Sequence, residues 1–116
     1  MANTFKNAAL ANVPTNGFSS GGTLYTCPSG TQTVVLGLAI VNKTTNAVTV
    51  QVQFTDSSAS NATFQLLENV SIPANTTLET LAGQNYIMEA QDILKVEAGT
   101  GSAIDVVMGL MEKAEG

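Results

Sequence analysis

The sequence contains no histidine, no arginine and no tryptophan, and Cys27 is its only cysteine. Without histidine, the commonest general base and the imidazole metal ligand are missing, so serine or cysteine triads of the usual kind are excluded. A lone cysteine forms neither an intrachain disulfide nor a cysteine metal cluster, and we expect Cys27 to be a small buried residue. With no tryptophan, only Tyr25 and Tyr86 remain as candidate sugar-stacking platforms, and each is typical of a core residue whose hydroxyl reaches solvent.

Charge is also scarce. Charged residues make up 11% of the chain, against about 25% in ordinary globular proteins. Four lysines are the only cations, and the formal net charge is −5. Direct nucleic-acid binding, which needs clustered cations and arginine, and binding to anionic membranes are therefore not expected. A surface built from Thr, Ser, Asn, Gln and Gly suits extracellular exposure or permanent contact with other subunits.

The carboxylates show no catalytic or metal-binding spacing. A glycosidase needs a facing pair, and the candidates lie on polar strand positions or in loops, where acids usually only solvate a face: Asp56, Glu68, Glu79, Glu89, Asp92, Glu97 and Asp105. The loop 56–61 holds one carboxylate, which is too few for calcium. We expect Asp92 to shape a turn. The sequence predicts no catalytic residue, no metal, no cofactor and no enzymatic activity.

The 116 residues, 44% of them hydrophobic, predict one globular domain with a core of its own. The first residues lack the basic region and apolar stretch of a signal peptide. No window approaches the roughly 20 apolar residues that span a bilayer. We therefore expect synthesis in a cytoplasm.

The strongest local signal is a pair of strands. Residues 34–41 (VVLGLAIV) form an apolar run rich in β-branched residues, and residues 48–55 (VTVQVQFT) alternate after a polar turn. Because side chains alternate between the faces of a strand, Val48, Val50, Val52 and Phe54 should share the buried face. Thr49, Gln51, Gln53 and Thr55 should share an outer face that is polar and uncharged. This pattern is typical of a half-buried antiparallel strand beside a more buried one.

Further short strands are expected at residues 23–27, 62–72, 76–81, 93–97 and 103–111, with a loop at 82–85 and a frayed tail at 112–116. The out-of-phase segment 67–69 indicates a bulge or bend. About seven short strands separated by Gly, Pro and Asn turns predict a single antiparallel β-sandwich with Greek-key or jelly-roll connections. An up-and-down barrel is the main alternative.

The N-terminal residues allow several interpretations. Residues 3–13 fit a short helix, an edge strand of the sheet, or an arm that reaches a neighbouring molecule. The segment 16–22 (NGFSSGG) breaks regular structure and suggests a flexible hinge. We expect an N-terminal arm and Gly/Ser-rich hinge at residues 1–22, followed by the sandwich domain at 23–116. An ordinary first strand of the same domain is the alternative to the arm.

Several segments together resemble a known family. They are residues 3–8 (NTFKNA), 23–31 (TLYTCPSGT), an apolar strand ending at Asn42, the alternation 48–52 leading to 56–58 (DSS), 72–74 (IPA) and 88–96 (MEAQDILKV). Their order resembles that of small virion structural proteins of tailed bacteriophages, particularly those infecting cyanobacteria. The resemblance covers nearly the whole chain, although its motifs are strand and turn patterns.

The resemblance implies a capsid decoration (cement) protein, commonly a trimer, that binds the major capsid protein on the exterior of the virion. A tail, neck or fibre component with weak binding of host-surface carbohydrate is the alternative. If the N-terminal segment is an arm, Phe5, Leu10 and Val13 would bury against an adjacent subunit. The polar face of Thr49, Gln51, Gln53 and Thr55 is a second candidate contact surface, because an uncharged face is easily desolvated.

Overall fold

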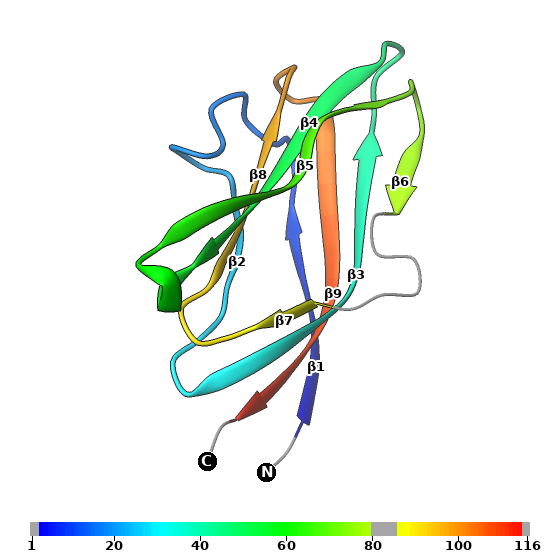
Figure 1. Cartoon of the computed structure of the whole chain (residues 1–116). Helices are drawn as coiled ribbons and strands as arrows, with labels where there is room; N and C mark the ends of the chain where they lie inside the picture. The colour runs from blue at the N-terminus through cyan, green and yellow to red at the C-terminus, as the bar shows by residue number, and fades with distance from the viewer. Residues whose placement is uncertain (1–2, 80–85, 115–116) are drawn as a thin grey trace.

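The computed structural model describes residues 3–79 and 86–114, whose regular structure is almost entirely β (Figure 1). A single short 3-10 turn, η1, spans Ser57–Ala59 within this part of the chain. The strands are β1 (Asn3–Leu10), β2 (Thr23–Thr26), β3 (Thr31–Asn42), β4 (Val48–Asp56), β5 (Ala62–Ile72), β6 (Thr77–Glu79), β7 (Tyr86–Met88), β8 (Ile93–Ala98) and β9 (Ile104–Ala114).

The strands form two antiparallel sheets that face each other. Sheet A has the order β1-β9-β3-β6, and β7 also pairs with β3; sheet B has the order β2-β8-β4-β5. The chain crosses repeatedly between the sheets, from β2 to β3 to β4 and later from β8 to β9, as Figure 1 shows. This is a jelly-roll sandwich, so the predicted all-β antiparallel fold is confirmed.

The core lies between the sheets and follows the predicted alternation. Val48, Val50 and Val52 of β4 are buried on one side, and Val106 and Met108 of β9 are buried on the other. Burying apolar area of this kind contributes about 25 cal/mol per Å². Cys27 is also fully buried in this core, with its Sγ 3.3 Å from the Thr31 carbonyl oxygen, which confirms the expectation of a small core residue.

Residues 3–10 are not a free arm. β1 pairs with β9 along its whole length, from Asn3 opposite Lys113 to Leu10 opposite Val106. Beyond the strand, the amide of Val13 donates to the Ile104 carbonyl at 2.8 Å, and its side chain is fully buried. The segment is the ordinary first strand that was the alternative to an arm, because the open edge of β9 satisfies its backbone hydrogen bonds.

The glycine-rich segment before β2 is a packed turn rather than a flexible hinge. Gly17 and Gly22 are buried against β8, and the Val96 amide donates to the Gly22 carbonyl at 2.8 Å. A Cβ added to Gly22 would lie 2.3 Å from the Val96 carbonyl oxygen. Glycine is required here because two backbones approach too closely for any side chain.

The predicted irregularity at residues 67–69 is a bulge in β5. Val50 of β4 pairs with Val70, but Val52 pairs with Leu67, so two residues of β5 oppose one residue of β4. Asn69 within the bulge has φ of 49°. Asparagine tolerates this left-handed conformation better than most residues do, and a bulge also blunts an edge strand such as β5.

The C-terminal strand is longer than predicted. β9 continues to Ala114, and Glu112 pairs with Thr4 on one side and with Thr33 on the other. Residues 112–114 are therefore strand and not frayed tail, because Glu112 and Lys113 have partners on both sides and Ala114 pairs with Thr31 of β3. The strand expected at 76–81 is β6, Thr77–Glu79, and the expected loop at 82–85 lies outside the described residues.

Candidate interaction surfaces

The outer face of sheet B carries an amide network centred on Gln65 of β5. Gln65 donates through Nε2 to Gln51 Oε1 and accepts at Oε1 from Gln53 Nε2, both at 3.1 Å. Gln51 donates in turn to Glu97 Oε1 at 3.5 Å. The predicted polar face of β4 therefore exists at Thr49, Gln51 and Gln53, and its amides are already engaged with one another.

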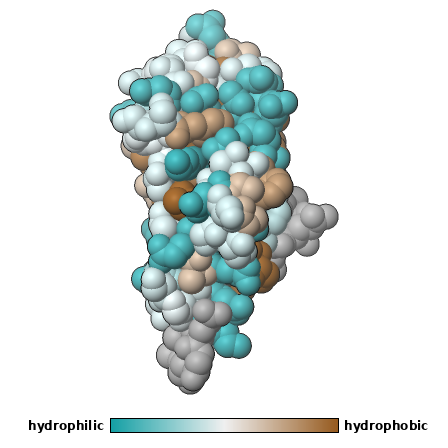
Figure 2. Space-filling model, turned by 60° about the vertical axis from the view of Figure 1, so that its left-hand side comes forward, coloured by the Kyte–Doolittle hydropathy of each residue, from teal (hydrophilic) through white to brown (hydrophobic). Residues whose placement is uncertain are grey.

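This face differs from the expected one in two respects. Lys95 and Glu97 of β8 lie directly opposite Gln53 and Gln51, so the face as a whole carries charge that the alternation within β4 does not reveal. Thr55 is only 7% exposed at the end of β4, where Asp56 leads into η1. Thr55 thus contributes no accessible contact, and desolvating the face is costlier than predicted. Figure 2 shows a surface on which hydrophilic residues interrupt small apolar patches.

The three N-terminal residues predicted to contact a neighbour differ in how far they are buried in the structure. Val13 is fully buried in the core of its own domain, and Leu10 packs against that core. Both are therefore used within the chain, contrary to the arm hypothesis. Phe5 is 73% exposed, and of the three it alone has a largely solvent-exposed side chain.

The outer face of sheet A is a surface that sequence reasoning missed. Five large apolar side chains are exposed among the described residues, and four of them belong to strands of sheet A: Phe5, Leu36, Ile87 and Val107. The outward residues of β9 include Val107, which sits between the inward apolar residues Val106 and Met108, and Met111, which follows the inward apolar residue Leu110. Such a run predicts a buried strand, so the sequence alone does not separate its exposed apolar side chains from the core.

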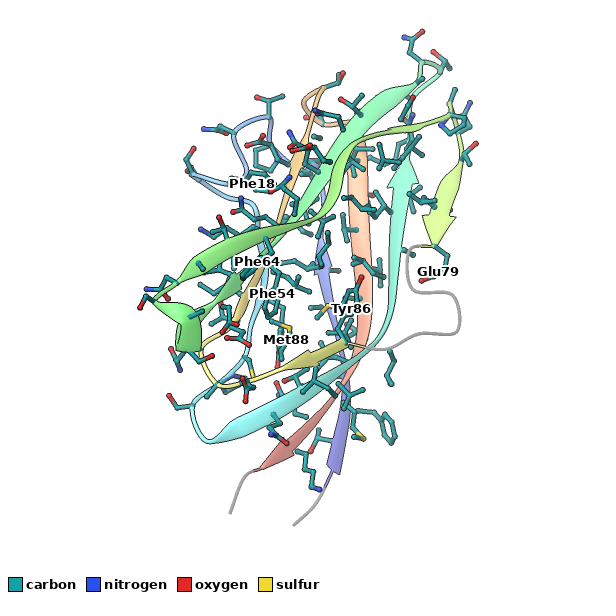
Figure 3. All side chains as sticks on the ribbon, in the orientation of Figure 1. Phe18, Phe54, Phe64, Glu79, Tyr86 and Met88 are labelled. Atoms are coloured by element: carbon teal, nitrogen blue, oxygen red, sulfur yellow. The ribbon has the colours of Figure 1, made fainter. Side chains whose placement is uncertain are left out.

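An apolar hollow is formed by residues of β4, β5 and β7. It has a volume of about 280 Å³ and is lined by Phe54, Leu66, Tyr86 and Ile87. Figure 3 shows Phe54 beside Phe64, its cross-strand partner, with Tyr86 across the gap. The hollow is smaller than most ligand pockets and accommodates an apolar side chain or the face of a small ring.

A polar cluster joins the sheets near the chain ends. The Tyr25 hydroxyl of β2 lies 2.5 Å from Glu112 Oε2 and 2.8 Å from Thr33 Oγ1, and Lys6 Nζ lies 2.9 Å from Glu112 Oε1. Burial and the neighbouring carboxylate raise the pKa of Tyr25 well above its usual value. Hydrogen bonds from Tyr25 and Lys6 lower the pKa of Glu112. These groups stabilise one another, which is a structural role.

The remaining acids mostly serve the backbone. Asp92 accepts hydrogen bonds from the amides of Glu89 and Ser57 at 2.8 and 3.0 Å, the turn-shaping role expected for it. Asp56 caps η1, and Glu79 accepts from the Leu38 amide at 3.0 Å. Within the described ranges, no three His, Cys, Asp or Glu side chains gather as a metal site. That part of the chain also contains no helix long and apolar enough to cross a membrane.

Comparison with known proteins identifies the fold class. No protein-family model matches the chain, and no curated protein matches it by sequence. A chain of the T13 infectious bursal disease virus particle is similar in structure, with TM-score 0.52 and 11% identity over 95% of this chain and 30% of that one. The globular domain of zebrafish complement 1qA is similar with TM-score 0.52 and 9% identity, over 95% and 96% of the two chains.

These likenesses place the chain in the jelly-roll class. At 9–11% identity they establish the fold alone. The chain corresponds to less than a third of the length of the viral chain that it resembles.

Proposed function

We propose that the chain is a non-enzymatic virion structural protein, a capsid decoration (cement) protein of the cyanophage type that binds the major capsid protein on the exterior of the phage head. It acts as a homo-oligomer, and a trimer is the form that the resemblance implies. The observation that carries the proposal is the jelly-roll fold, which a viral particle chain shares over 95% of this sequence. The sequence resemblance to small phage virion proteins points the same way.

The chemistry of the surface supports a structural role. The carboxylates serve turns, strand amides and salt bridges, as at Asp92, Glu79 and Glu112. Histidine is absent from the chain. What the surface offers is a polar amide network on one sheet and exposed apolar side chains on the other, which are means of contacting proteins.

The test is binding to phage heads that lack the protein. Purified protein should co-sediment with expanded heads in saturable amounts and raise their melting temperature, because a ligand that binds only the assembled state stabilises it. Particle images should show many copies over the head. Absence of binding, or density at one vertex only, would contradict the proposal.

A tail, neck or fibre position is the second candidate, and the apolar hollow beside Tyr86 is the observation that favours it. Phe54 and Tyr86 supply aromatic surface of the kind that packs against sugar rings. Weak binding to host-surface carbohydrate that Tyr86→Ala abolishes, together with density confined to the tail, would support this candidate over the first.

A further inference from the structure

We infer that the outer face of sheet A is the surface through which two copies of this chain associate. The inference rests on the homo-oligomer of the proposed function and names the contact surface. The polar face of sheet B, which the sequence suggested, then stays open to solvent or to other partners.

Cross-strand pairing arranges the outward residues of sheet A in rows. Phe5 pairs with Met111, Met111 with Val34 and Val34 with Ile87, so one apolar row crosses four strands. Inward neighbours of these residues, such as Leu110, Val35 and Met88, are buried. The alternation of strand side chains therefore fixes the row on the outer face.

The next two rows make the outer face of sheet A uneven, with a trough and a second ridge. Gly109 pairs with Gly37 of β3 and with Asn7 of β1, and a Cβ added at Gly109 would meet nothing within 4 Å. Beyond this trough, Val107 pairs with Ala9 and with Ala39 and is 47% exposed. A ridge, a trough of small residues and a lower ridge allow side chains of another sandwich to interdigitate, as facing sheets do in a core.

Charge favours a second copy as the occupant. The chain carries a formal net charge of −5, so two copies repel unless they meet where acids are absent or paired. On this face Asp105 is paired with Lys43 at 3.0 Å, and Glu79 sits at the edge strand, where its Oε1 accepts from the Leu38 amide (Figure 3). The three rows hold no charged residue on β1, β9 or β3. Glu79 of β6 pairs with Ala39 at the end of the Val107 row, and its Oε1 would lie 3.6 Å from a Cβ added at Gly37. Sheet B instead presents Lys95 and Glu97 in its centre.

The size of the face is sufficient for a specific contact. From Asp105 to Lys113 it is about 27 Å long, and four strands make it about 19 Å wide. Each copy therefore offers about 500 Å², and a pair buries about 1,000 Å², which is the lower limit for a specific interface. We expect association at micromolar concentrations rather than an obligate oligomer.

Sedimentation of the purified chain without capsids tests the inference, so its failure is distinguishable from failure of capsid binding. Over about 1–200 μM protein, a range that brackets weak specific association, the wild type should form a dimer, because a face that meets its own copy closes as a pair. Val107→Glu adds a charge to the face, and Gly109→Val fills the trough where the fold has room. Each should raise the dissociation constant at least tenfold. Thr49→Glu adds the same charge to an exposed strand position of sheet B and should leave the dissociation constant unchanged.

Circular dichroism and thermal melting at low concentration establish that each variant is folded. A wild type that stays monomeric throughout the range would overturn the inference. So would an oligomer that dissociates with Thr49→Glu and persists with both Val107→Glu and Gly109→Val. Loss of capsid binding in the sheet A variants of a monomeric wild type would instead assign this face to the capsid protein.

Discussion

Tyr25 links the two sheets through a single hydroxyl group. It belongs to β2 of sheet B, and it contacts Thr33 and Glu112 of sheet A at 2.8 and 2.5 Å. Tyr25→Phe keeps the ring and removes both contacts, so we expect the free energy of unfolding to fall by about 1–2 kcal/mol. Chemical denaturation measures this change. Asn7→Ala, at an exposed position of β1, is the control and should change it by less than about 0.5 kcal/mol. Equal effects of the two substitutions would contradict the role of the hydroxyl.

Glu112 makes stability depend on pH. Its pKa is lowered in the folded protein because Tyr25 and Lys6 donate hydrogen bonds to its carboxylate. A lowered pKa means that the stabilisation is present above the unfolded value of 4.5 and is lost as the pH falls through the folded value. Unfolding measured from pH 6 to about pH 3 should show a steeper loss of stability for the wild type than for Glu112→Gln. The exposed Glu68→Gln on β5 controls for the removal of one negative charge and should keep the wild-type slope.

At the scale of elements, the glycine-rich turn before β2 holds β8 in place. The Gly22 carbonyl accepts from the Val96 amide, and an added Cβ would lie 2.3 Å from the Gly17 and Val96 carbonyl oxygens. Gly22→Ala must therefore displace backbone, and we expect it to cost about 3 kcal/mol and to lower the melting temperature by about 10 °C or more. Gly109→Ala, which has open space in β9, should leave the melting temperature unchanged or slightly higher. Equal melting temperatures for the two variants would show that the turn accommodates a Cβ at Gly22 without loss of stability.

What the sequence reveals about the elements depends on how local the signal is. The alternation of residues 48–54 predicted the buried valines of β4 correctly, because one strand carries its own period. It did not reveal Lys95 and Glu97 beside Gln53 and Gln51, because cross-strand neighbours come from distant segments. For the same reason the sequence did not reveal that β1 pairs with β9. A first strand within the same domain therefore stayed one of several possibilities for residues 3–13. Strand β7 has three residues, which are too few to show a periodic pattern.

At the scale of the whole molecule, the two outer faces of the sandwich offer different chemistry. Sheet B presents amides and charges that are already hydrogen-bonded to one another around Gln65. Sheet A presents exposed apolar side chains, Phe5 and Val107 among them, around a trough of small residues. The proposed decoration role requires two distinct surfaces, one for copies of the chain and one for a capsid, and the two faces of the sandwich differ in this way. The scarcity of charge, which first appears as an exclusion in the composition, is what leaves sheet A free for contact with another acidic copy.

Salt dependence distinguishes apolar self-association from pairing through lysines and acids. Two chains of net charge −5 repel at long range, and salt screens that repulsion within a Debye length of about 3 Å at 1 M. Sulfate additionally strengthens the burial of apolar surface. We therefore expect sodium sulfate added to a dilute buffer to lower the dissociation constant of the wild-type oligomer severalfold, measured by sedimentation. The Val107→Glu variant should self-associate more weakly than the wild type at every salt concentration, because burying its carboxylate costs free energy that screening does not restore. Dissociation of the wild-type oligomer by sodium chloride would point instead to ion pairs, and then Lys95 and Glu97 of sheet B would be the residues to mutate.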